Sequence, residues 1–236
     1  MTLLVACGLT RETRIFAGNG VAAVAGGGNA ARLETGLEAA IGAGGVSAIL
    51  SGGIAGALDL ALRPGDVVIG TTPERFSRES GSPAQPDAAF AALDSRVRGR
   101  TAELLPDARF GCIVGSDTIV ATLAQKRALY EATGALAVDM ESHIAARVAA
   151  RHALPFAILR TISDGADHVL PPAALVGMKP DGGMALGAVL ASLARHPSQL
   201  PALIRTGRDA GRAFMALERA FPVIERLWRE HYALAG

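Results

Sequence analysis

The sequence predicts an α/β fold, a single-domain three-layer sandwich with a twisted, mixed but largely parallel sheet. Two observations lead to this prediction. Short apolar or β-branched runs alternate with longer alanine-rich helical stretches, and the runs are hydrophobic at nearly every position, which is typical of strands buried on both faces. The chain has 236 residues, 50% of them hydrophobic, which is enough for one buried core and short for two.

The predicted strands, in chain order, are Leu3–Cys7, Val21–Ala25, Val46–Leu50, Val67–Ile69, Ile113–Val114, Ala135–Val138 and Phe156–Leu159. The predicted helices are Ala30–Ile41, Leu123–Thr133 and Ser142–Ala153, with stop signals at Gly42 and Gly134. Residues Glu74–Asp87 have no hydrophobic period, so we expect an exposed loop there that acts as a flap. We expect a helical C-terminal extension from about residue 184 and no second domain.

The composition argues against several classes of function. With 23 basic and 22 acidic side chains, no overall field is present to hold a polyanion, so we expect no nucleic-acid partner. Cys7 and Cys112 have no partner motif and the five histidines lack metal-ligand spacing, so we expect no disulfide and no metal. The N-terminus does not resemble a signal peptide and no apolar run is long enough to span a membrane, which predicts a soluble, cytoplasmic protein.

Polar residues that follow the predicted strands are candidates for a site, because ligands bind at the carboxyl ends of strands in an open α/β sheet. Glu12 follows the first strand, where an acid also suits the start of a helix. Residues Gly26–Asn29 turn a strand into a helix and offer backbone N–H groups to an oxyanion, although their spacing is not that of a dinucleotide site. The glycines of Ser51–Gly56 imply close backbone approach to a ligand or to another segment.

The strongest pattern is a pair of polar stretches at two predicted strand ends. Residues 138–142 are Val-Asp-Met-Glu-Ser, and residues 159–167 are Leu-Arg-Thr-Ile-Ser-Asp-Gly-Ala-Asp. Each acid taken alone is explained by a helix dipole or an ion pair. Because both stretches would bring their carboxylates and Arg160 to one edge of the sheet, together they favour a functional site.

These stretches resemble those of the purine nucleoside phosphorylase and methylthioadenosine nucleosidase superfamily. The resemblance spans about residues 2–168 and includes, in the family's order, Gly53-Ile54-Ala55-Gly56, Pro64-Gly65-Asp66, Gly115-Ser116-Asp117, Asp139-Met140-Glu141 and Arg160 to Asp167. The tail, with residues 178–183 and 196–201, resembles the hopanoid-associated phosphorylase subgroup, which is thought to remove adenine from adenosylhopane.

The resemblance implies a role for each matching residue. Asp164, next to Ser163, would protonate N7 of the leaving purine, and Glu141 would accept hydrogen bonds from the ribose 2′ and 3′ hydroxyls. Glu12 would orient the attacking water. Met140 would pack under the sugar, and Arg160 would hold the carboxylates in place. The other implied substrate contacts are Ser163, Thr118, Ile119, Gly53 and Ile54. The residues implied at a phosphate or other nucleophile are Gly27, Gly28 and Arg11.

The chain departs from the family pattern at three places. Ile54 stands where the family usually has a serine, and Thr118 and Ile119 stand where nucleosidases place an aromatic side chain. Ser51 stands where phosphorylases place a phosphate-binding arginine. Phosphorolysis and hydrolysis therefore both remain open, with inorganic phosphate as a candidate co-substrate and no other cofactor expected.

The resemblance thus implies cleavage of the N-glycosidic bond of an adenine nucleoside with a bulky apolar 5′ group, similar to adenosylhopane, in hopanoid biosynthesis. The enzymatic alternative is a methylthioadenosine/adenosylhomocysteine nucleosidase. The non-enzymatic alternative is a protein that binds a nucleoside or a lipid-linked nucleoside without cleaving it. By family analogy we expect a homo-oligomer, with a dimer favoured.

The C-terminal stretch carries two superimposed patterns. Apolar residues recur at steps of three and four, and arginines group on another face: Phe214, Leu217, Phe221, Ile224 and Trp228 against Arg205, Arg208, Arg212, Arg219, Arg226 and Arg229. A basic amphipathic helix of this kind suits peripheral contact with the inner face of an anionic membrane. The alternative is a terminal helix packed on the core or on a second subunit, with its arginines in solvent, and Pro222 is expected to interrupt the stripe.

Overall fold

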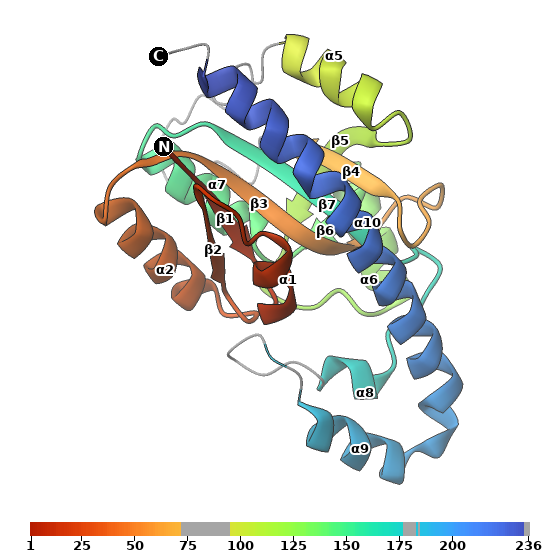
Figure 1. Ribbon diagram of the computed structural model, residues 1–236. Coiled ribbons are helices and arrows are strands. Elements are labelled where there is room, and N and C mark those ends of the chain that lie inside the picture. The colour runs from red at the N-terminus through yellow and green to blue at the C-terminus, as the bar shows by residue number, and fades with distance from the viewer. Residues whose placement is uncertain (72–94, 177–182, 184, 234–236) are drawn as a thin grey trace.

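The computed structural model describes residues 1–71, 95–176, 183 and 185–233. The described residues form an α/β fold around a seven-stranded mixed sheet, as predicted (Figure 1). The predicted flap at residues 74–87 lies outside the described residues, as does the stretch 178–182 of the tail motif.

The seven strands are β1 (Thr2–Cys7), β2 (Val21–Ala25), β3 (Val46–Ala57), β4 (Val67–Thr71), β5 (Arg109–Gly115), β6 (Ala137–Asp139) and β7 (Phe156–Asp164). Their order in the sheet is β2-β1-β3-β6-β5-β4-β7, and β3 also pairs with β7. The β3–β6 and β4–β7 pairs are antiparallel and the other pairs are parallel. Strands β3, β7, β4, β5 and β6 therefore form a closed ring of pairings, and the sheet is not the open one assumed from the sequence.

The ring closes because β3 and β7 are longer than predicted. The glycine-rich stretch Ser51–Gly56, expected to leave the strand, continues β3, and Arg160–Asp164 continues β7. The two strands run parallel, with Gly53 opposite Arg160. Glycines let large side chains pack across β3, since a Cβ on Gly52 would lie 2.7 Å from the ring of Phe16.

The sheet is buried on both faces, which confirms three layers. Helices α2 (Ala30–Gly42) and α7 (Ser142–Arg151) cover one face together with a cluster that includes Leu4 of β1. Helix α10 (Leu200–Ala233) crosses the other face, where its Leu217 packs with Val5 (Figure 1). The other helices are α1 (Thr10–Ile15), α5 (Ser95–Leu104), α6 (Leu123–Thr133), α8 (Pro172–Leu175), α9 (Leu186–Arg195) and the 3₁₀ turn η1 (Pro197–Gln199).

Helix α10 buries the apolar stripe that the sequence shows near the C-terminus. Leu217 and Phe221 are fully buried, and the Phe221 ring meets the Phe16 ring edge-on at 4.9 Å. The helix continues through Pro222, so the predicted interruption there is wrong. Because this stripe covers the core and the six arginines face outward, the packed alternative is confirmed and the stripe is not a membrane-facing surface. Within the described residues, no helix is both long and apolar enough to cross a bilayer.

Candidate active site

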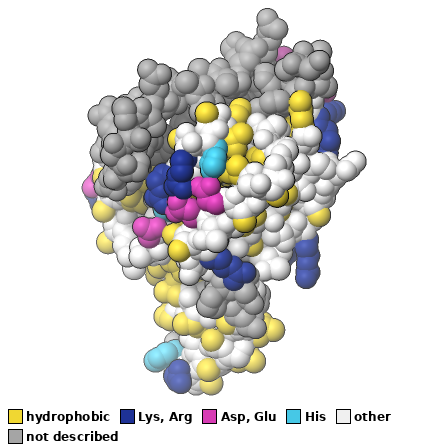
Figure 2. Space-filling model, turned by 90° about the vertical axis from the view of Figure 1, so that its left-hand side faces the viewer, with side chains coloured by type: hydrophobic (Ala, Val, Ile, Leu, Met, Phe, Trp, Pro, Cys, Tyr) yellow, Lys and Arg dark blue, Asp and Glu magenta, His cyan; other side chains and the backbone are white. Residues whose placement is uncertain are grey.

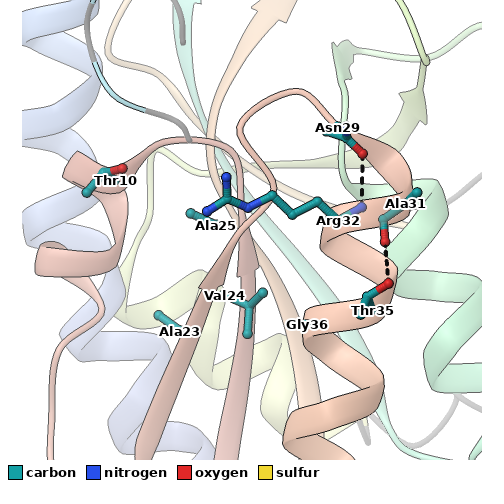
Figure 3. A pocket seen from close by; sticks show the side chains of 9 residues that line it. All are labelled: Thr10, Ala23, Val24, Ala25, Asn29, Ala31, Arg32, Thr35 and Gly36. Atoms are coloured by element: carbon teal, nitrogen blue, oxygen red, sulfur yellow. Dashed lines mark hydrogen bonds between the residues drawn. The ribbon is translucent and has the colours of Figure 1, made fainter. Parts of the chain in front are cut away.

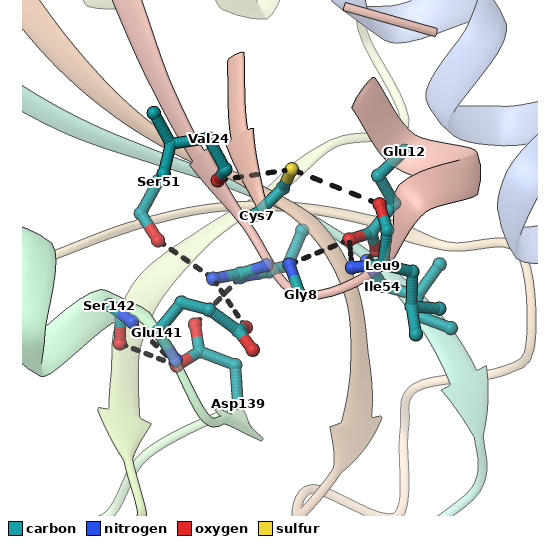
Figure 4. A network of polar contacts seen from close by, with 11 residues as sticks. Cys7, Gly8, Leu9, Glu12, Val24, Ser51, Ile54, Asp139, Glu141 and Ser142 are labelled. Atoms are coloured by element: carbon teal, nitrogen blue, oxygen red, sulfur yellow. Dashed lines mark hydrogen bonds and ion pairs between the residues drawn. The ribbon is translucent and has the colours of Figure 1, made fainter. Parts of the chain in front are cut away.

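A buried polar network brings together Glu12, Asp139 and Glu141 (Figure 4). Arg160 of β7 is its centre. Its guanidinium is fully buried, and it donates from Nε to Asp139 Oδ2 at 2.6 Å and from Nη2 to the Ser51 hydroxyl at 2.7 Å. Nη2 also lies 3.4 Å from Glu141 Oε2. Burying a guanidinium costs several kcal/mol unless carboxylates offset the lost hydration, so these contacts are what allow Arg160 to sit here.

Asp139 links this network to the start of helix α7. Its Oδ1 accepts hydrogen bonds from the backbone N–H and the hydroxyl of Ser142, at 2.9 and 2.8 Å. The positive end of the helix favours the ionised carboxylate there. Asp139 therefore fixes Arg160 against α7, and it makes both structural contacts, with a helix start and with an arginine, that the sequence offered for an acid at this strand end.

Glu12 is buried, with 1% of its surface exposed, and is not the solvated helix-start acid that its position alone suggests. Its Oε2 accepts from the N–H groups of Gly8 and Leu9, and its Oε1 accepts from the N–H of Ile54, all at 2.8 Å. Burial raises the pKa of Glu12, while Arg160 and the three N–H groups oppose the rise. This carboxyl is thus held in one orientation and poised to take up a proton.

Glu12 and Arg160 meet at Gly53. A Cβ on Gly53 would lie 2.5 Å from Glu12 Oε1 and 2.6 Å from Arg160 Nη1, so only glycine fits. Arg160 Nη1 is buried and has no hydrogen-bond partner within the described part of the chain. A buried donor without a partner costs about 1–3 kcal/mol, so the geometry favours a small ligand that accepts from Nη1.

Glu141 lies on the other side of the guanidinium. A Cβ on Gly8 would lie 2.7 Å from Glu141 Oε1, so the end of β1 passes directly beside this carboxyl. Burial, and then the negative charges of Asp139 and Glu12, raise the pKa of Glu141 to about 8, although Arg160 opposes the rise. The network therefore holds more carboxyl groups than Arg160 alone neutralises.

Asp164, at the end of β7, has a partner that sequence reasoning missed. Lys126 of α6 is buried and donates from Nζ to Asp164 Oδ2 at 2.5 Å and to the Gly165 carbonyl at 2.7 Å. The Ser163 hydroxyl lies 2.8 Å from Asp164 Oδ1 and 3.1 Å from the Ala55 carbonyl. One sequence signal was present, because Lys126 is one of only two lysines in the chain.

Comparison with known proteins places the chain in a family. Residues 7–195 match the family described as the phosphorylase superfamily. The chain belongs to this superfamily. It is 30% identical over 121 residues to the 5′-methylthioadenosine/S-adenosylhomocysteine nucleosidase of Staphylococcus aureus strain MRSA252. That match covers 47% of this chain and 53% of the nucleosidase, so the chain spans about half the length of this curated relative.

Solved structures share the phosphorylase-superfamily fold over nearly the whole chain. A Helicobacter pylori methylthioadenosine nucleosidase mutant with 5′-methylthioadenosine in its active site gives a TM-score of 0.61 at 14% identity, covering 97% of this chain and 98% of that one. An S-adenosylhomocysteine nucleosidase from Streptococcus pyogenes gives 0.59 at 16% identity, covering 94% and 96%. At such low identity these similarities establish the fold.

The structure shows what the residues predicted to hold phosphate contact in the folded chain. The N–H groups of Gly26 and Gly27 donate to the carbonyls of Cys7 and Gly8, at 2.8 and 2.9 Å. Because these amides already close the turn after β2, they do not form the cradle predicted from the glycines. Arg11 is exposed and its guanidinium stacks 4.0 Å above the Phe214 ring of α10. The role predicted for Gly28 stays a prediction.

The remaining predicted contacts are less buried than the Arg160 network. Met140 is half-buried between Asp139 and Glu141. Thr118 is exposed and Ile119 half-buried in the loop after β5, where the Ser116 hydroxyl donates to the Thr118 carbonyl at 2.7 Å. Their roles in holding a purine stay predictions. Among the described residues, no three His, Cys, Asp or Glu side chains gather as a metal site.

A separate hollow of about 980 Å³ lies between β2 and α2 (Figure 3). It contains none of the predicted site residues; its lining is Thr10, Ala23, Val24, Ala25, Asn29, Ala31, Arg32, Thr35 and Gly36. The Asn29 side-chain oxygen accepts from the Arg32 N–H at 2.9 Å, and the Thr35 hydroxyl donates to the Ala31 carbonyl at 2.8 Å. Both side chains are therefore hydrogen-bonded to α2 itself. The hollow therefore lacks the converging acids of the Arg160 network, which we take as the candidate active site.

The raised pKa of Glu141 predicts how stability varies with pH. The folded protein holds the Glu141 proton up to about pH 8, whereas the unfolded chain releases it near the ordinary value of 4.5. Stability from this group is therefore complete below 4.5 and falls as pH rises toward 8. In Glu141→Gln this contribution is absent. We expect thermal melts between about pH 5 and pH 8 to show a steeper fall in Tm for the wild type than for the variant. Parallel falls in both proteins would contradict this assignment.

Proposed function

We propose that the chain hydrolyses the N-glycosidic bond of an adenine nucleoside and releases adenine and a free sugar. The observation that carries the proposal is the buried Arg160 Nη1, which has no partner within the described residues and lies next to Glu12 Oε1 across Gly53. A water molecule there would accept from Arg160 and donate to Glu12. This is the arrangement that a general base needs to activate water.

The remaining carboxyl groups supply the other requirements of the reaction. Glu12 takes a proton from the water as its oxygen bonds to C1′ of the sugar. Asp164 meets N7 of the purine, so that the base departs as neutral adenine and not as the poorer leaving anion. Glu141 accepts hydrogen bonds from the two vicinal hydroxyls of ribose, which suit the two oxygens of one carboxylate.

Water is a better nucleophile than phosphate for this site. Asp139, Glu12 and Glu141 surround the single guanidinium of Arg160, so its positive charge is already shared among acidic side chains and little of it is left to hold a phosphate dianion. Ser51, which stands where phosphorylases have an arginine, is occupied by the hydrogen bond from Arg160 Nη2. The amides of Gly26 and Gly27 are also occupied. These contacts favour hydrolysis.

A second set of observations favours a large apolar 5′ substituent, as in adenosylhopane, over a small methylthio group. Helices α8, α9 and the start of α10 project from the body (Figure 1), and many hydrophobic side chains lie on the face of this projection that Figure 2 shows. The exposed apolar residues there are Leu175, Val176, Leu186, Leu190, Leu200 and Ile204. Contiguous exposed apolar surface is typical of binding sites for apolar ligands or membranes. Exposed Arg195 and Arg205 nearby suit anionic lipid headgroups, which supports peripheral membrane contact and a role in hopanoid metabolism.

One experiment tests these proposals together. The protein is incubated in oxygen-18 water with methylthioadenosine or with an adenosine that carries a long hydrocarbon at C5′, each with and without phosphate. We expect adenine and an oxygen-18-labelled free sugar without phosphate, and faster release from the hydrocarbon nucleoside. A phosphate-dependent sugar phosphate would overturn hydrolysis, and a preference for methylthioadenosine would overturn the apolar substituent. Binding of both nucleosides without release of adenine would establish the binding-protein alternative.

A further inference from the structure

Lys126 is buried at a place where a lysine is costly. It lies in the first turn of α6, which begins with the Thr122–Gln125 capping box, and the N-terminal turn of a helix disfavours positive charge. Its side chain is 1% exposed, so hydration does not stabilise the ammonium. The contacts that offset this cost are the Asp164 carboxylate and the Gly165 carbonyl. The stability of α6 therefore does not explain why a lysine stands at this position. The contact with Asp164 does explain it.

Both oxygens of Asp164 lie next to donors. Lys126 Nζ donates to Oδ2, and the Ser163 hydroxyl lies within hydrogen-bond distance of Oδ1. Because both oxygens of Asp164 accept from these donors, a proton that Asp164 passes to the purine has to be replaced from one of them. Of the two side chains hydrogen-bonded to Asp164, the Lys126 ammonium is the better proton donor, because it is a cation that carries three N–H protons, whereas the Ser163 hydroxyl is neutral and carries one.

We propose that Lys126 is a positioning residue that supplies, through Asp164, the proton taken by the leaving base. This inference rests on the proposed function. As the C1′–N9 bond breaks, its electron pair passes to the purine ring. N7 takes a proton from Asp164, and Asp164 Oδ2 takes one from Lys126 Nζ. Lys126 is left as a neutral amine and Glu12 is left protonated by the attacking water, and exchange with solvent restores both.

The test compares two substrates that differ in their need for a proton. Adenine leaves from methylthioadenosine only when N7 is protonated, whereas nitrophenolate leaves from 4-nitrophenyl riboside as a stable anion. We expect Lys126→Met to slow adenine release by about 100-fold or more and nitrophenolate release by less than about threefold. Equal losses on both substrates would show a purely structural role and overturn the proposal.

A second variant removes the risk that an unpaired Asp164 unfolds the protein. Lys126→Met is added to Asp164→Asn, so that both charges of the pair disappear together. If Lys126 acts through Asp164, the double variant releases adenine as slowly as Asp164→Asn alone. A further loss as large as that in the wild-type background would overturn the proposal. Thermal melts accompany each rate.

The wild-type protein separates failure of this inference from failure of the proposed function. If the wild type releases adenine neither from methylthioadenosine nor from the adenosine with a hydrocarbon at C5′, the proposed hydrolysis is wrong and the proton path through Lys126 is wrong with it. If the wild type cleaves both methylthioadenosine and 4-nitrophenyl riboside and Lys126→Met loses both activities equally, only the role of Lys126 is wrong. Retention of both wild-type rates in Lys126→Met also overturns that role and leaves the hydrolysis intact.

Discussion

Asp164→Asn is expected to slow adenine release by about 10²- to 10⁴-fold while the protein stays folded. The amide has the same size as the carboxyl group and its oxygen still accepts from Lys126 Nζ, so the hydrogen bond made at 2.5 Å in the wild type remains although the ion pair is lost. What is lost is the group that passes a proton to N7, without which the purine must leave as an anion. Chromatographic measurement of adenine at saturating substrate gives kcat directly.

The matched control is Asp167→Asn, in the same motif three residues further along the chain. Its carboxyl is exposed, with 60% of the side-chain surface accessible, so its loss removes no buried interaction. We expect wild-type kcat from this variant. Adenine release by Asp164→Asn at the wild-type rate would show that Asp164 is not the acid.

Arg160→Leu is expected to lower the free energy of unfolding by about 3–5 kcal/mol. The substitution leaves Asp139, Glu12 and Glu141 buried without their shared counter-ion, and it removes the donors to Asp139 and Ser51. Breaking a buried ion pair from one side costs far more than an intact pair contributes, because the remaining charges stay desolvated. Urea unfolding near neutral pH measures the change.

Arg151→Leu provides the comparison for Arg160→Leu. Arg151 also contacts two carboxylates, Glu34 and Glu38, but its side chain is 49% exposed. Because water and salt screen such pairs, we expect a loss of about 1 kcal/mol or less. Equal losses for the two variants would contradict the central role of the Arg160 network.

Local patterns in the sequence were enough to predict most of the elements. Strand β2 and helix α6 have the predicted limits, and Gly134 ends α6 in a left-handed conformation, with φ at 66°, as its position as a stop signal predicts. These features depend on burial period and capping, which act between neighbours in the chain. The Asp-Met-Glu and Ser-Asp motifs were predicted for the same reason, because each is a short stretch at a strand end.

The lengths of β3 and β7 were not predictable from local patterns. Ser51–Gly56 has the composition of a loop, since glycine disfavours strands. Its strand conformation comes from pairing with β7, whose register places Gly53 beside Arg160. Helix α10 likewise continues through Pro222 because its apolar stripe packs along the sheet, and this packing outweighs the local preference of proline.

The sequence by itself determined the α/β class, the order of most elements, the family resemblance and the acids named for the site. Only the tertiary structure decided that Glu12 is buried beside Arg160, that the amides of Gly26 and Gly27 are occupied, and that Lys126 holds Asp164. The partners Lys126 and Asp164 are 38 residues apart, and Arg160 and Ser51 are 109 apart. Local periodicity and short motifs do not predict such pairs. The two partners attract each other strongly only after folding has buried both of them, away from water, at the same place.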